Sequence, residues 1–302
     1  MADLHGVLSA LVTPFTDETD TVDEPALRAL VERTIAAGAH GLVPCGSTGE
    51  FAAMTNDERR QVVEIVIDQA AGRVPTVAHT AAMTTRAAIS LSQHAESAGA
   101  AAIMVVAPYY EPLSLDEVSS YYREVARAVS IDVMVYNLPV ATGVNVSPDV
   151  VAKLATEMPN IRYVKDTSGD LSQALRLIHD HADVVSTFVG WDTLYFTSLV
   201  EGAAGSVIGA ANIIPAELVG IYDAVQAGDL RGARTIWAEV YPLMQFLTSG
   251  GYVSAVKGAL NVIGQPIGDP RPPMESLHGA RLADLRAALG HIASVTTQVG
   301  RA

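Results

Sequence analysis

The sequence predicts an α/β fold, a (β/α)₈ TIM barrel followed by a C-terminal extension of three helices. Short apolar runs rich in Val and Ile alternate with longer amphipathic stretches. The runs are apolar on both sides, as expected for parallel strands covered on both faces. Eight run–stretch pairs follow one another up to Gly228, and eight units favour a closed barrel over an open doubly wound sheet.

Each pair has a strand-like run and a helix-like stretch. The expected strands are 6–15, 41–45, 74–80, 101–108, 133–139, 161–168, 184–190 and 205–210. The expected helices are 25–37, 56–71, 84–98, 115–129, 148–155, 171–179, 194–201 and 215–226. Helix-start residues are Asn56 and Ser114 as N-caps and Pro25, Pro148 and Pro215 in first turns; helix-end residues are Gly38, Gly99 and Gly228.

The chain after Gly228 contains no further strand–helix pair. Three helical patterns cover 230–247, 252–263 and 274–295, and residues 264–273 form a loop between the second and third. We therefore divide the chain into a barrel, residues 1–228, and a helical extension, residues 229–302.

Composition restricts the partners of this chain. Nineteen Lys and Arg residues against 33 Asp and Glu give a net charge of −14, which repels nucleic acid and anionic lipid. The single cysteine excludes an internal disulfide, and the uncharged stretch 202–216 is interrupted by glycine and proline. With no signal peptide expected, the prediction is a cytoplasmic protein that binds neither nucleic acid nor membrane.

Polar residues gather at the ends of the predicted strands, where barrel enzymes carry their chemistry. They are Thr13, Gly46 to Glu50, His79, Tyr109, Tyr110, Tyr136, Asn137, Lys165, Asp166, Thr167, Gly190, Asp192 and Gly209.

Lys165 is one of only three lysines and ends a strand that should be buried. A buried ammonium is costly, so this side chain either pairs with a carboxylate such as Asp166 or readily becomes a neutral amine. A neutral amine can attack a carbonyl and form an imine. Tyr136 ends the preceding strand, roughly 4.8 Å away, and could move protons for that reaction or simply be half-buried.

The run Gly46-Ser47-Thr48-Gly49-Glu50 lies between a strand and a helix. Its backbone amides and two hydroxyls suit a carboxylate or phosphate, although an ordinary turn explains the run equally well. Asp192 either contacts substrate hydroxyls or caps a helix. His79 is more typical of a structural histidine, and the eight histidines have no metal-ligand spacing. We expect no metal and no cofactor.

Together these residues resemble the dihydrodipicolinate synthase / N-acetylneuraminate lyase family of class I, Schiff-base aldolases. The resemblance covers about residues 6–277. It rests on Gly46-Ser47-Thr48-Gly49-Glu50, Pro108-Tyr109-Tyr110, Tyr136-Asn137-Leu138-Pro139 and Lys165-Asp166-Thr167-Ser168-Gly169-Asp170. The order and spacing of these segments also agree with the family.

The resemblance implies a role for each matching residue. Lys165 would form the imine with a 2-oxo acid, and Tyr136, hydrogen-bonded to Thr48, would transfer protons. Ser47, Thr48 and Gly49 would hold the substrate carboxylate. Tyr110 would reach into a neighbouring subunit's site, which implies a homotetramer built as a dimer of dimers. Other substrate-binding positions implied by the neuraminate lyase branch are Thr167, Gly190, Asp192 and Gly209.

Three positions depart from the two best-known branches. Ala141 stands where dihydrodipicolinate synthases carry an arginine for the second substrate's carboxylate, and a methyl group cannot replace that bidentate pair. Thr193 and Ala210 replace a glutamate and a serine of the neuraminate lyase branch. A 2-oxo-3-deoxy sugar acid shorter than sialic acid therefore fits better.

The sequence thus predicts a class I, pyruvate-dependent lyase, either an aldolase or a dehydratase, acting on pyruvate or a 2-oxo-3-deoxy sugar acid. One alternative is 4-hydroxy-tetrahydrodipicolinate (dihydrodipicolinate) synthase, which condenses pyruvate with aspartate semialdehyde. A second is a barrel isomerase or phosphate-sugar enzyme that uses His79 and Glu50 without an imine. A third is a catalytically inactive barrel that binds a small acid.

Overall fold

Eight parallel strands form a barrel in the computed structural model, which describes residues 3–16, 20–111 and 113–292. The strands are β1 Gly6–Ala10, β2 Gly41–Val43, β3 Val77–His79, β4 Ala102–Val106, β5 Asp132–Asn137, β6 Ile161–Asp166, β7 Ser186–Val189 and β8 Gly205–Ile208. They pair in the order β2-β1-β8-β7-β6-β5-β4-β3. A parallel bridge between Leu42 and Thr76 links β2 to the residue before β3, so the ring closes as predicted.

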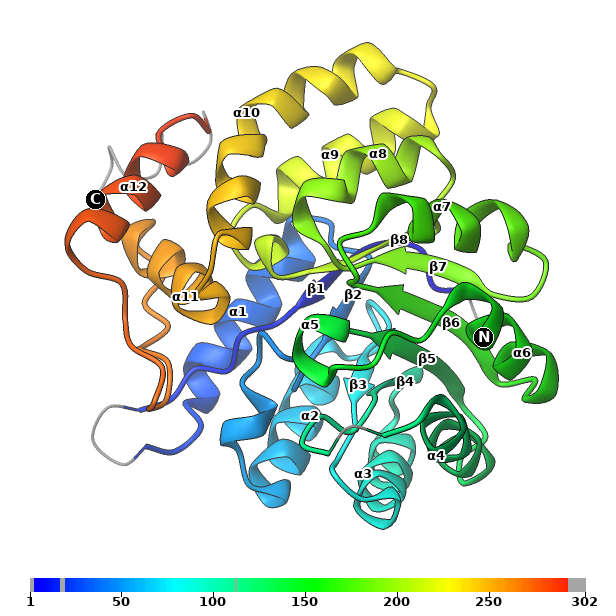
Figure 1. Cartoon of the computed structure of the whole chain (residues 1–302). Coiled ribbons are helices and arrows are strands. Elements are labelled where there is room, and N and C mark those ends of the chain that lie inside the picture. Colours follow the sequence, from blue (N-terminus) through cyan, green and yellow to red (C-terminus); the bar gives the residue numbers. More distant parts are fainter. Residues whose placement is uncertain (1–2, 17–19, 112, 293–302) are drawn as a thin grey trace.

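Helices surround this ring of strands (Figure 1). They are α1 Glu24–Ala36, α2 Asn56–Ala70, α3 Thr85–Ala98, α4 Leu115–Arg127, α5 Pro139–Thr142, α6 Pro148–Glu157, α7 Leu171–Asp180, α8 Tyr195–Val200 and α9 Pro215–Gln226. The short α5, a single turn after β5, was not predicted. Every strand residue of β4 and β5 is buried, in keeping with a sheet covered on both faces.

Most helix boundaries agree with the sequence signals, and one cap does not. Ser114 caps α4, and its hydroxyl accepts the Glu117 N–H as predicted. Asn56 is not a cap; it is the first residue of α2. Thr55 caps that helix because its hydroxyl accepts the Glu58 N–H while the Glu58 carboxylate accepts the Thr55 N–H.

The first strand is shorter than the predicted 6–15. It ends at Ala10, although the Leu11 N–H still donates to the Val43 carbonyl. The next amide, of Val12, donates instead to the side chain of Asn212 at 3.1 Å. The apolar run continues beyond the strand because the following residues also pack into the core, so hydrophobicity alone does not mark where pairing stops.

Three helices follow the barrel, drawn yellow to red in Figure 1: α10 Leu230–Thr248, α11 Tyr252–Val262 and α12 Gly279–Leu289. The predicted start of the third helix at Met274 is wrong. Its first residues stay irregular because the Met274 N–H closes a turn onto the Arg271 carbonyl and Ser276 bonds the Asp269 carboxylate. The predicted end at Val295 lies outside the described residues, and the division at residue 228 stays a prediction.

Among the helices of the described residues, none combines the length with the apolar composition that a membrane span requires.

Candidate active site

A cavity of about 360 Å³ lies at the C-terminal ends of the strands. Five of the eight strands, or the residues just after them, contribute to its wall, which is where a barrel places its chemistry. The lining residues include Ser47, Thr48, Tyr136, Leu138, Lys165, Thr167, Gly190, Trp191, Asp192, Val207, Gly209 and Tyr252.

Lys165 lies in the wall of this cavity near the end of β6 and is only 5% exposed. Its register partner on β5 is Tyr136, and the Lys165 Nζ lies 4.0 Å from the centre of the Tyr136 ring. Within the described residues Lys165 forms no salt bridge. Its amine is therefore placed to meet a ligand in the cavity rather than a carboxylate of the protein.

Asp166, the alternative partner for Lys165, is occupied elsewhere. Its Oδ1 accepts from Asn137 Nδ2 and Gln173 Nε2, each at 2.9 Å, and its Oδ2 accepts from Ser168 Oγ at 2.7 Å. These neutral donors satisfy the buried carboxylate without a cation. The structural alternative for Lys165, a salt bridge with its neighbour, is therefore not formed.

The expected hydrogen bond between Thr48 and Tyr136 is also not formed among the described residues. Both side chains line the cavity, but the Tyr136 ring turns its face toward Lys165. The Tyr136 hydroxyl has no protein partner in this part of the chain, so it can serve a bound ligand.

Gly190 leaves space for the Lys165 side chain because it has no Cβ atom. A Cβ atom at this position would lie 2.0 Å from Thr167 Oγ1 and 2.6 Å from Lys165 Cε. The Thr167 hydroxyl is buried and has no hydrogen-bond partner among the described residues. A buried hydroxyl left without a partner is costly, so this one is a further candidate ligand contact.

Asp192 and Tyr252 form a hydrogen-bonded pair in the same cavity wall. The Tyr252 hydroxyl lies 2.9 and 2.8 Å from the two Asp192 carboxylate oxygens and donates to them, and it accepts the Gly209 N–H at 2.9 Å. Burial raises the pKa of Asp192 to about 6, although the Tyr252 hydrogen bond and the Lys165 charge oppose that rise. Asp192 lines the cavity and does not cap the short helix η2, Asp192–Leu194, whose N-cap residue is Trp191.

The raised pKa of Asp192 makes a prediction about stability. Between about pH 4 and 6 the folded protein binds this proton more tightly than the unfolded chain, so stability is lost as pH rises through about 6. Asp192→Asn removes the charge, and its free energy of unfolding should exceed that of the unaltered protein by up to about 3 kcal/mol at pH 7 but by little at pH 4. Urea unfolding at several pH values measures this difference; a difference that is constant with pH would contradict the assignment.

Comparison with known proteins agrees with this geometry. Residues 3–292 match the Dihydrodipicolinate synthetase family. The curated 4-hydroxy-tetrahydrodipicolinate synthase of Methanopyrus kandleri is 38% identical over 272 residues, covering 90% of this chain and 91% of the relative. That of Acidobacterium capsulatum is 38% identical over 292 residues, covering 95% and 96%. The chain belongs to the dihydrodipicolinate synthetase family.

Solved structures agree at the level of the whole chain. YagE, a prophage protein of the dihydrodipicolinic acid synthase family from E. coli K12, was crystallised with pyruvate; it is 30% identical with a TM-score of 0.92, covering 98% of this chain and 99% of its own. The Acinetobacter baumannii dihydrodipicolinate synthase, also complexed with pyruvate, is 32% identical with a TM-score of 0.92, covering 96% and 99%. As a member of the dihydrodipicolinate synthetase family, this protein is a class I, Schiff-base-forming lyase, and that prediction is confirmed.

Most of the site residues that the family resemblance implied line the cavity. Two of them, Gly49 and Tyr110, do not. Gly49 packs against the barrel instead, since a Cβ there would lie 2.9 Å from the Leu11 carbonyl oxygen. Tyr110 is 81% exposed on the loop after β4. The predicted residues at the cavity are Ser47, Thr48, Tyr136, Lys165, Thr167, Gly190, Asp192 and Gly209.

His79 does not support an imine-free reaction in this member of the dihydrodipicolinate synthetase family. The ring is buried with its centre 6.3 Å from the centre of the Tyr136 ring, and it does not line the cavity. Burial, with the charges of Arg59 and Lys165, lowers its pKa well below the ordinary value, so the ring stays neutral. Its ring nitrogens form no hydrogen bond with the described residues. The nearby Cys45 backbone raises the His79 pKa, but burial and the two positive charges outweigh this effect.

Tyr252 is a cavity residue that was not predicted from the sequence. Its hydroxyl completes the Asp192 pair, and the segment from Leu247 to Val253 supplies several further wall residues. The only local signal is Gly250-Gly251, which marks a turn that is compatible with close packing against the barrel mouth.

Proposed function

We propose that Lys165 forms an imine with pyruvate or with the 2-oxo end of a 2-oxo-3-deoxy sugar acid. The observation that carries the proposal is the placement of its amine: it is buried, has no carboxylate partner in the described chain, and lies in the wall of the cavity at the C-terminal ends of the strands. Lys165 Nζ attacks the substrate's carbonyl carbon, and the carbonyl oxygen leaves as water.

The other wall residues take roles that match their chemistry. Tyr136 transfers protons to and from the imine and the leaving group, since its hydroxyl has no competing protein partner in the described residues. Ser47 and Thr48 hold the substrate carboxylate with hydroxyl and backbone donors. The hydroxylated part of the substrate contacts Asp192, with Thr167, Gly190 and Gly209 beside it.

Two reactions remain open once the imine has formed. Breaking a carbon–carbon bond yields pyruvate and an aldehyde, whereas loss of a hydroxyl yields water and a dioxo acid. Mass spectrometry of the products distinguishes them, because only dehydration gives an organic product lighter than the substrate by one water.

The synthase reaction is the second candidate, because the curated relatives carry that name. The charges around the site do not favour it. Lys165 is the only cation lining the 360 Å³ cavity within the described chain. An adjoining cavity of about 450 Å³ includes Ala141, and its one charged lining residue is Glu50. Neither provides a second cation for the carboxylate of aspartate semialdehyde.

Restoring that cation should therefore raise synthase activity. In Ala141→Arg, an arginine on the exposed side of α5 would offer a bidentate partner to the aspartate semialdehyde carboxylate. We expect kcat/KM for condensation with pyruvate to rise by roughly 10- to 100-fold, the usual worth of a charged hydrogen bond. Ala141→Gln is the uncharged control. If the unaltered protein already condenses these substrates as fast as the arginine variant, its reaction is the synthase reaction instead.

Borohydride trapping tests the imine itself. The protein is incubated with pyruvate, reduced, digested and analysed by mass spectrometry, and the expected result is a reduced pyruvate adduct on Lys165. An unmodified Lys165 would contradict the proposal. The same reduction with a panel of 2-oxo-3-deoxy sugar acids, combined with turnover assays, separates a lyase from a barrel that only binds small acids.

The assembly forms a further part of the proposal. We infer that the protein is a homotetramer, a dimer of dimers, in which Tyr110 contributes to the site of a neighbouring subunit. The exposure of this large aromatic side chain supports the inference. We also infer that this assembly is cytoplasmic. Sedimentation of the unaltered protein gives the subunit number, and a Tyr110→Ala variant that stays fully active would contradict the role of this residue.

A further inference from the structure

We propose that a buried network of Glu50, Lys257 and Arg271 positions the turn that carries Ser47 and Thr48, so that the C-terminal extension controls how the site receives the substrate carboxylate. The inference rests on the proposed function, because it assigns these two hydroxyls to the 2-oxo acid. None of the three network residues lines the 360 Å³ cavity, so they act through the turn.

The turn is held at both ends in an unfavourable backbone conformation. Cys45 and Glu50 have φ of 59° and 60°, in the left-handed region that non-glycine residues seldom adopt. Such conformations persist only where the surroundings enforce them. Within the turn, the Gly49 N–H donates to the Gly46 carbonyl at 3.0 Å, and Thr13 Oγ1 donates to the Gly49 carbonyl at 2.8 Å. The Glu50 N–H donates to the Ser47 carbonyl at 3.2 Å, and a further restraint on Glu50 comes from outside the turn.

The Glu50 carboxylate provides that restraint. Lys257 Nζ lies 2.6 Å from Oε1 in an ion pair whose angle departs from an ideal hydrogen bond, and the Arg271 backbone N–H donates to Oε2 at 2.8 Å. The two charged side chains are 0% and 1% exposed. Burial lowers the pKa of Lys257, whereas Glu50 opposes that change. Removing one partner would leave the other charge buried alone, so the pair strongly favours one arrangement.

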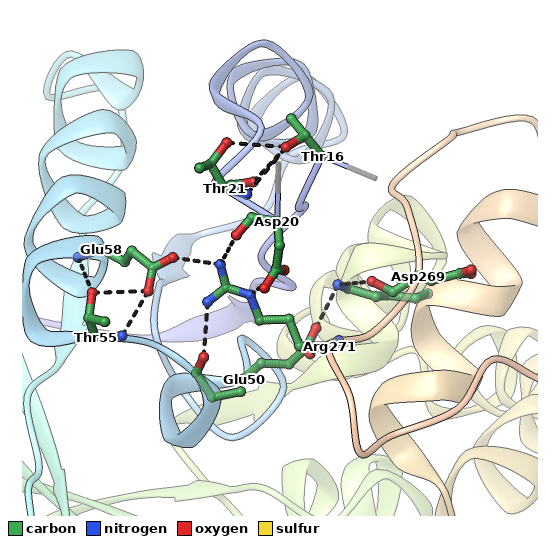
Figure 2. Close-up of polar contacts among 10 residues, drawn as sticks. Thr16, Asp20, Thr21, Glu50, Thr55, Glu58, Asp269 and Arg271 are labelled. Atoms are coloured by element: carbon green, nitrogen blue, oxygen red, sulfur yellow. Dashed lines mark hydrogen bonds and ion pairs between the residues drawn. The ribbon is translucent and has the colours of Figure 1, made fainter. Parts of the chain in front are cut away.

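Arg271 also links the residues around Glu50 to more distant segments of the chain. Figure 2 shows its guanidinium between Asp20 and Glu58: Nε donates to Asp20 Oδ1 at 2.8 Å, and a terminal nitrogen donates to Glu58 Oε1 at 2.5 Å. The other terminal nitrogen donates to the Ala53 carbonyl at 2.9 Å. Ala53 ends the short helix η1, Phe51–Ala53, which directly follows Glu50.

One aromatic ring completes the network. The Phe15 ring centre lies 3.9 Å from the Arg271 guanidinium carbon and 4.6 Å from Lys257 Nζ. Both cations are thus fixed by carboxylate, carbonyl and ring contacts, and Lys257 also donates to the Asp269 carbonyl at 2.9 Å. A rigid set of this kind transmits a change at Glu50 to Thr48, two residues away, with little relaxation.

The test measures imine formation as a function of pyruvate concentration by borohydride trapping, with each rate divided by the number of sites that exhaustive trapping modifies. The variants are Glu50→Gln and the double variant Glu50→Gln/Lys257→Met, and thermal unfolding is followed in parallel. Glu32→Gln is the matched control, because that carboxylate pairs with Arg73 at 2.7 Å on the outside of the barrel, away from the site.

We expect Glu50→Gln to unfold at a lower temperature and to raise the half-saturating pyruvate concentration roughly tenfold or more, since small displacements of positioning groups are costly. The double variant should recover stability, because no charge is buried alone, yet keep the raised half-saturation. Glu32→Gln should behave as the unaltered protein.

The half-saturating concentration decides the outcome, because loss of folded protein alone leaves it unchanged. A double variant with the half-saturation of the unaltered protein would show that the network is merely structural and overturn the inference. If the unaltered protein itself gives no adduct, the proposed imine fails, which is a separate result.

Discussion

Lys165→Ala is expected to abolish the borohydride-trapped adduct and to lower turnover by roughly 10⁴-fold or more, the scale of loss when a covalent nucleophile is removed. The structure gives the physical reason. In the described chain no other amine lines the cavity, and the Tyr136 hydroxyl cannot form an imine. Trapping with pyruvate, followed by peptide mass spectrometry and a steady-state assay, measures both effects.

Lys153→Ala is the matched control for this variant. Lys153 lies on α6 with its side chain 68% exposed, so its loss should change neither adduct nor turnover. Lys257 is unsuitable for this purpose, because its ammonium is buried against Glu50. Full-speed turnover by Lys165→Ala, with the fold intact by circular dichroism, would refute the imine mechanism.

Gly190→Ala is expected to lower kcat/KM by roughly 10²-fold, the effect of displacing a reacting group by about 1 Å. The added methyl group would lie 2.0 Å from Thr167 Oγ1 and 2.6 Å from Lys165 Cε, distances that neither atom can tolerate without moving. The lysine side chain must then leave its position beside the Tyr136 ring. The rate of borohydride trapping should fall together with turnover.

Gly220→Ala controls for the change of glycine to alanine. That residue lies within α9, and an added Cβ would make an ordinary contact of 3.5 Å with Ile236. Alanine also favours a helix interior more than glycine does, so this variant should be as active and at least as stable as the unaltered protein. Equal activity of the two glycine variants would show that Lys165 does not need the space at residue 190.

The barrel and much of its cavity could be predicted from local sequence patterns. Tyr136 and Lys165 were expected side by side because they end consecutive strands, and their register pairs them directly. The α2 cap was missed by one residue because Thr55 and Asn56 can both cap, and the reciprocal bond with Glu58 decides between them. Composition could not show that Lys165 lacks a salt bridge, since the neighbouring Asp166 was a possible partner for it.

Contacts between distant segments were beyond the reach of sequence patterns. Tyr252 contacts Asp192 across 60 residues, and the Arg271 amide meets Glu50 across 221 residues. Neither Tyr252 nor Arg271 lies in a periodic pattern or motif from which its distant partner could be predicted. The roles of the site residues, including Tyr110 and Gly49, stay predictions until the variants are measured.

The segment from Leu247 to Val253 forms part of the cavity wall from outside the eight-stranded ring. A truncated chain that stops at the end of the last barrel helix would therefore keep Lys165 but leave it open to bulk solvent. In the whole chain, exchange of a few side chains around Tyr252 would change the shape of the cavity while the strands and Lys165 keep their places.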